Sequence, residues 1–95
     1  MWKNLYEADS IGSEGGIILV DEEYKEACRI TLERCERYCA VTCGVYGAMF
    51  HTAFSDIDKG QELYGAMKQD LQEFIDRDTT LEEEVAFYKR FTEQY

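Results

Sequence analysis

The chain has 95 residues, enough for a single domain over residues 1–95 with one hydrophobic core. Hydrophobic residues make up 45% of the sequence and aromatic residues 14%, which excludes a disordered protein by composition. The formal net charge is −10, from 20 acidic and 10 basic residues. A field of that sign repels phosphate backbones, so no binding to nucleic acid is expected.

The hydropathy of the chain and its first residues indicate the cellular compartment. No stretch approaches the roughly 20 apolar residues of a membrane span, so no contact with a membrane is expected. The first ten residues, MWKNLYEADS, lack the basic-then-apolar order of a secretory signal. We therefore expect a cytoplasmic protein. Its negative charge would attract a basic partner protein. A simpler explanation is that the charge keeps the protein soluble.

The beginning of the chain predicts one short strand. A segment with apolar Trp2, Leu5 and Tyr6, which fits a short helix, precedes a Gly/Ser-rich loop at 10–16, SIGSEGG. The run 17–20, IILV, lies between two glycines and three acidic residues. A β-branched run with such boundaries indicates a short buried strand.

The middle of the chain, residues 21–54, fits two different periods. CRITLE, at 28–33, alternates between apolar and polar residues as a half-buried strand does. A helical period of apolar or small residues is also present, at positions 24, 28, 31, 35, 39, 43 and 47. Periodicity alone therefore allows either two strands or one long helix.

Glycines and strand-forming residues decide between these two periods. Gly44 and Gly47 would each cost a helix about 1 kcal/mol relative to alanine. The same stretch, AVTCGVYGAMFHTAF, is rich in β-branched and aromatic residues. We therefore predict strands at 27–34 and 39–54, with a turn near 36–37 and a bend at one of the two glycines. An all-α fold with a long helix at 21–54 is the alternative.

The last forty residues predict two amphipathic helices, at 58–76 and 80–94. Thr79 lies three residues before Glu82, as in a capping box at the start of the second helix. The apolar stripe of the first helix has spacings of three and four, at Tyr64, Met67, Leu71, Phe74 and Ile75. The sequence thus predicts an α+β fold, in which about three antiparallel strands carry two antiparallel helices on one face.

Two motifs of the middle region also suggest a resemblance. The pair CRITLE and VTCGVYG, followed by His51-Thr52, resembles a motif pair in a family of small uncharacterised bacterial proteins. The resemblance covers about residues 15–95. It implies a similar fold and carries no activity.

The cysteines are spaced in a way that disfavours a metal site. Cys35, Cys39 and Cys43 are four residues apart, with Cys28 upstream. On a helix such residues rise by ~6 Å per step, and on a strand they lie ~13 Å apart. Neither geometry brings four ligands to one zinc ion or closes a disulfide along the strand. We predict buried structural cysteines without metal or cofactor; a reactive thiol is the alternative.

Candidate site residues are few. A pocket between sheet and helices could have His51, Cys43, Tyr46 and Arg29 as its polar lining. His51 and Cys43 stand eight residues apart on the predicted strand, too far for a Cys–His nucleophile pair. No P-loop, G-x-S-x-G or H-E-x-x-H motif is present. We assign no catalytic residue and expect a protein that is not an enzyme; a small-ligand binder or thiol/His enzyme is the alternative.

The predicted strand 39–54 is apolar on both faces, whereas two helices can cover only one. One side carries Val41, Val45 and Met49, and the other carries Tyr46, Phe50 and Phe54. An uncovered apolar face usually marks a protein contact. The sequence therefore predicts a non-enzymatic protein-interaction or self-associating module that forms a two-fold homodimer. The alternative is that the segment around Trp2 folds over this face.

Overall fold

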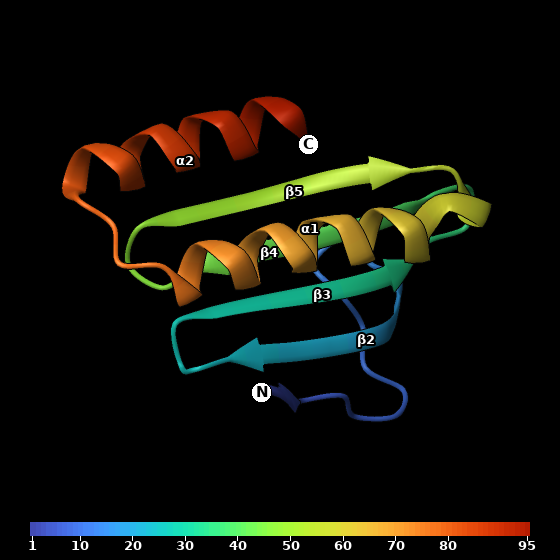
Figure 1. Cartoon of the computed structure of the whole chain (residues 1–95). Coiled ribbons are helices and arrows are strands. Elements are labelled where there is room, and N and C mark those ends of the chain that lie inside the picture. Colours follow the sequence, from blue (N-terminus) through green and yellow to red (C-terminus); the bar gives the residue numbers. More distant parts are fainter.

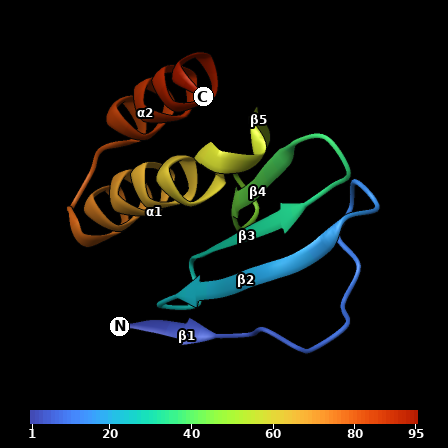
Figure 2. The same ribbon diagram turned by 90° about the vertical axis from the view of Figure 1, so that its right-hand side faces the viewer.

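Five antiparallel strands form one sheet in the order of the sequence, and two helices lie on one of its faces (Figures 1 and 2). The structure is a computed structural model that describes all residues, 1–95. Its elements are β1 (Trp2–Asn4), β2 (Ile17–Tyr24), β3 (Cys28–Arg34), β4 (Cys39–Val45), β5 (Met49–Ser55), a 3-10 turn η1 (Ile57–Lys59), α1 (Gly60–Asp76) and α2 (Leu81–Gln94). The predicted α+β class is confirmed, and the all-α alternative with a helix at 21–54 is wrong.

The predicted strand at 39–54 is in fact two strands joined by a tight turn. Gly47 lies in this turn at φ +74°, a conformation that glycine adopts without steric cost. The N–H of Ala48 donates to the carbonyl of Val45, and Val45 pairs with Met49 across the hairpin. The chain therefore reverses at Gly47 instead of bending. The sheet has five strands, not about three.

Two further strand predictions differ from the structure. The N-terminal segment is an edge strand, β1, and β2 continues from residue 20 to Tyr24. The acidic residues at 21–23 do not end β2, because each has a partner within the fold. Asp21 accepts hydrogen bonds from Arg29, and Glu22 accepts one from Lys68. The turn near 36–37 is where the sequence places it, between β3 and β4.

Both helices begin and end within two residues of their predicted bounds. The capping box is one residue further along than predicted, because α2 begins at Leu81 and its N-cap is Thr80. The Thr80 hydroxyl accepts a hydrogen bond from the Glu83 N–H, and the Glu83 carboxylate accepts one from the Thr80 N–H. Neither helix is both long enough and apolar enough to cross a membrane.

The hydrophobic core lies between the sheet and the helices. Phe74 of α1 stacks on Phe87 of α2 at a centroid distance of 4.0 Å. Trp2 stacks on Tyr24, and its indole N–H donates to Gln72 of α1. The Trp2 side chain thus belongs to the helix side, and the alternative that it covers the other face is wrong. The residues of this core that are wholly buried are Cys28, Ile30, Leu32, Val41, Met67, Leu71 and Phe91.

Candidate functional site

The face of the sheet opposite the helices, here called the open face, is not covered by any helix (Figure 2). Successive residues of a strand point to opposite faces, so strand register assigns each side chain to one of them. The open face is formed by Ile18, Asp21, Glu23, Arg29, Thr31, Glu33, Ala40, Thr42, Gly44, Phe50, Thr52 and Phe54. It divides into two halves of different chemistry.

The half formed by β4 and β5 carries no charge. Residues 38–55 contain no Asp, Glu, Lys or Arg, although such residues make up 32% of the chain. Phe50 and Phe54 project from β5 with exposed fractions of 75% and 57%. Beside them, the open side of β4 carries only small side chains, those of Ala40, Thr42 and Gly44. We call these residues of β4 and β5 the uncharged half of the open face.

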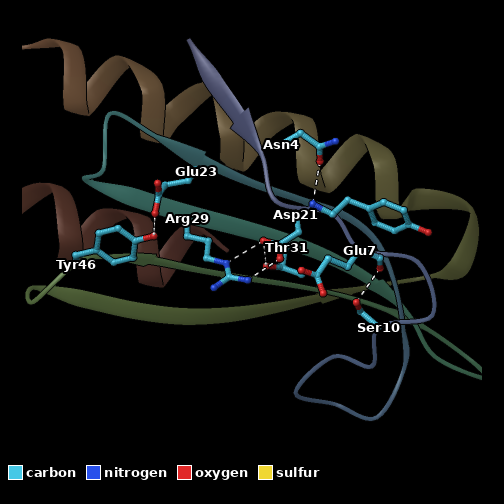
Figure 3. A network of polar contacts seen from close by, with 9 residues as sticks. Asn4, Glu7, Ser10, Asp21, Glu23, Arg29, Thr31 and Tyr46 are labelled. Carbon is cyan, nitrogen blue, oxygen red and sulfur yellow. Dashed lines mark hydrogen bonds and ion pairs between the residues drawn. The ribbon is translucent and has the colours of Figure 1, made fainter.

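The half formed by β2 and β3 carries charged residues, of which Arg29 and Asp21 form an ion pair (Figure 3). The guanidinium of Arg29 donates from Nε and Nη2 to the two carboxylate oxygens of Asp21, at 2.9 and 2.6 Å. The Thr31 hydroxyl donates to the same carboxylate at 3.0 Å. Asp21 is only 4% exposed, and its hydrogen bonds raise the pKa of Arg29 above the ordinary value. This geometry fixes the guanidinium against the sheet.

A second polar contact joins the β4–β5 turn to β2. Tyr46 leaves the turn, crosses the open face and donates its hydroxyl to Glu23 (Figure 3). Desolvation of the hydroxyl, and then the bond to Glu23, raise the pKa of Tyr46 to about 12. The phenol therefore remains a hydrogen-bond donor across the neutral range, and its ring forms a wall at this end of the face.

Glu33 holds the loop between β1 and β2 against the other end of the open face. Its carboxylate is 2% exposed and accepts the N–H groups of Glu14 and Gly16 at 3.2 and 2.8 Å. A Cβ on Gly12 would lie within 2.4–2.6 Å of this carboxylate, so a larger residue at this position would have to displace it. The loop also bonds to β2, since the Ile18 N–H donates to the carbonyl of Ser10. It thus forms a fixed wall.

Between this loop and the β4–β5 turn lies a pocket of about 670 Å³ on the open face. Its volume is in the range of small-molecule sites, about 300–1,000 Å³. Side chains of both halves contribute to its lining, among them Ile11, Ile18, Arg29, Thr42, Tyr46 and Phe50. The pocket is therefore on the face away from the helices, whereas the sequence suggested a pocket between sheet and helices.

The four residues predicted as a polar lining do not form one site. Arg29 and Tyr46 line the pocket, and Cys43 borders it from β4 while its side chain belongs to the core. His51 lies on the helix side, where it packs edge-on against Phe91 and its buried Nε2 has no hydrogen-bond partner. The sheet separates His51 from Arg29 and Tyr46.

Cys43 and His51 are nevertheless direct neighbours. The turn at Gly47 pairs them across β4 and β5, so the expectation that they are too far apart is wrong. The neighbourhood does not activate the thiol, because burial raises the pKa of Cys43 to about 12. A nucleophilic cysteine needs a lowered pKa. The four cysteines are free, and no three His, Cys, Asp or Glu side chains converge as metal ligands.

Sequence reasoning missed Asp21, Glu33 and the loop residue Ile11. Asp21 and Glu33 sit in strands at positions where charged residues usually face water. Asp21 is buried under Arg29 of β3, and Glu33 is buried under the loop. The alternation of β3 did place Arg29, Thr31 and Glu33 on one face.

Comparison with protein-family models, curated proteins and solved structures finds no match.

Proposed function

We propose that this chain is a non-enzymatic, self-associating protein module, in which a second copy covers the uncharged half of the open face. The observation that carries the proposal is the pair of exposed phenylalanines, Phe50 and Phe54, in the one long stretch without charge, 38–55. Exposed apolar patches of this kind mark protein contacts. Burying both rings against another copy removes them from water.

The charge of the chain favours a second copy over a basic partner. A basic protein would be attracted to acidic surface, and the uncharged half offers it none. Two copies each carry a net charge of −10 and repel one another over most of their surfaces. A contact between copies is therefore favoured where acidic residues are absent, as they are over residues 38–55.

The uncharged half combines large and small side chains. Phe50 and Phe54 project from β5, and their cross-strand partners on β4, Gly44 and Ala40, are small. A two-fold axis between two such faces would place the rings of one copy over the small side chains of the other. Sheets packed in this way lie about 10 Å apart, with aromatic rings between them.

The test compares two exposed apolar residues on opposite sides of the molecule. Phe54→Ser removes a ring from the uncharged half, and the control Leu81→Ser changes a residue that is 74% exposed at the start of α2. We expect sedimentation to show that Phe54→Ser weakens the dimer by at least about tenfold and that Leu81→Ser leaves it unchanged. Equal effects of both variants, or a native chain that stays monomeric, would overturn the proposal.

A further inference from the structure

The pocket on the open face has a polar group that the self-association does not use. The guanidinium of Arg29 bonds to Asp21 through Nε and Nη2, and its Nη1 donates no hydrogen bond within the protein. Its side chain is half exposed, whereas Asp21 is buried beneath it. Asp21 and Thr31 thus hold a donor in a fixed direction at the wall of the pocket (Figure 3).

The charges around the pocket select the ligand class. Asp21 already neutralises Arg29, so an anion gains little net attraction and meets the field of a chain with a net charge of −10. A cation finds no free carboxylate, because those of Asp21 and Glu33 are buried and bonded to Arg29, Thr31 and loop N–H groups. A neutral molecule is not repelled by the net charge and needs no counter-charge in the pocket.

The rest of the lining is apolar or carries hydroxyl groups. Ile11 and Ile18 lie on the loop side, and the rings of Tyr46 and Phe50 lie on the side of the β4–β5 turn. The strands between them carry Thr31, Thr42 and Gly44, which leave room above the sheet. Flat aromatic bodies pack well against such walls.

We propose that this pocket binds an uncharged, flat aromatic or apolar molecule whose carbonyl oxygen accepts a hydrogen bond from Nη1 of Arg29. This inference does not rest on self-association. Thr42, Gly44 and Phe50 belong both to the pocket and to the uncharged half, so ligand and second copy compete for them. Binding is therefore measured on Phe54→Ser as well as on the native chain, because Phe54 lies outside the pocket.

Three probes with the same ring and different charge test the ligand class: naphthalene-2-carboxamide, naphthalene-2-carboxylate and 2-naphthylmethylamine. Titrations followed by NMR should move the amide signals of Thr31 and Gly44. We expect the neutral carboxamide to bind at least about tenfold more tightly than either charged probe. Equal or tighter binding of the carboxylate or the amine, or no shift at these amides with any probe, would overturn the proposal.

Substitutions test the position of the ligand. Arg29→Met should weaken carboxamide binding by about tenfold, with its fold checked by circular dichroism. Because this variant leaves Asp21 without its partner, a second variant fills the pocket instead: Thr42→Phe. Its control is Thr52→Phe, the same change at the cross-strand neighbour, which does not line the pocket.

We expect Thr42→Phe to abolish binding of the carboxamide and Thr52→Phe to preserve it. Binding retained by Thr42→Phe would contradict the assigned pocket, whatever the behaviour of Arg29→Met. Failure of the self-association appears in sedimentation and failure of the pocket appears in these titrations, so each proposal can fail without the other.

Discussion

The covered face and the open face of the sheet are built from the same strands and carry opposite kinds of side chain. On the covered face Ile30, Leu32 and Val41 are wholly buried under the helices. On the open face, one residue along each strand, paired charges and hydroxyls lie beside exposed Phe50 and Phe54. The alternation along each strand therefore separates two tasks: the covered face stabilises the fold, and the open face remains available for contacts.

The largest expected effect tests this division with two phenylalanines. Phe91→Ala removes a wholly buried ring that contacts His51 and Phe87, and we expect it to lower the free energy of unfolding by about 3–5 kcal/mol. Phe50→Ala removes a ring that is three-quarters exposed, so we expect a loss within about 0.5 kcal/mol at concentrations where the chain is monomeric. Urea unfolding of both variants measures the difference. Similar losses would show that the open face also stabilises the monomer.

A smaller effect is expected at the buried carboxylate of the open face. Glu33→Gln keeps the shape of the side chain but replaces one oxygen that accepts a loop N–H, and we expect a loss of about 1–3 kcal/mol. Amide exchange of Glu14 and Gly16 should become faster. Glu36→Gln, at an exposed turn position, is the control and should change neither quantity. Unchanged amide exchange in Glu33→Gln would show that the loop is held by other contacts.

The smallest expected effect concerns the thiols of the covered face at alkaline pH. Burial raises the pKa of Cys43 to about 12 and that of Cys28 to about 11, from an ordinary value of 9.0. The unfolded chain releases these protons at lower pH than the folded chain. The two protonated thiols therefore stabilise the folded state fully below about pH 9, and this stabilisation is lost as the pH rises toward their pKa values in the folded chain. Cys43→Ala should show a shallower decline in urea midpoint between neutral and alkaline pH than the native chain.

Thiol labelling provides a second readout of the same burial. A thiol reagent should reach half-buried Cys35 in the folded protein and modify Cys43 only as fast as the chain unfolds. Rapid modification of Cys43 without urea would contradict the assignment of this thiol to the core.

The sequence predicts the covered face well and the open face only in part. Residues 58–94 show both helices because their apolar spacing follows the helical period, and the β-branched run at 17–20 marks β2. The separation of β4 from β5 was missed because the turn is short and apolar residues continue on both sides of Gly47. A glycine indicates a turn as readily as a bend, and only the pairing of Val45 with Met49 decides between them.

The pocket depends on contacts between residues far apart in the sequence. Glu33 reaches loop residues seventeen or more positions upstream, and Tyr46 reaches Glu23 across β3. Such contacts have no local pattern in the chain. Alternation places Tyr46 on the side of Phe50 and Phe54, but it does not show which strands lie side by side or which face the helices cover. Once the register is known, Arg29 and Tyr46 fall on the open face and His51 on the covered one.

Self-association through the uncharged half is the central claim, and its dependence on salt tests it most directly. Screening weakens the repulsion between two copies with a net charge of −10, since the Debye length falls from about 10 Å at 0.1 M to about 3 Å at 1 M salt. Sedimentation equilibrium of the native chain should therefore give a mass of twice 11.1 kDa, with a dimer that becomes tighter as salt is added. A mass of 11.1 kDa at every salt concentration, or a dimer that salt dissociates, would contradict the account.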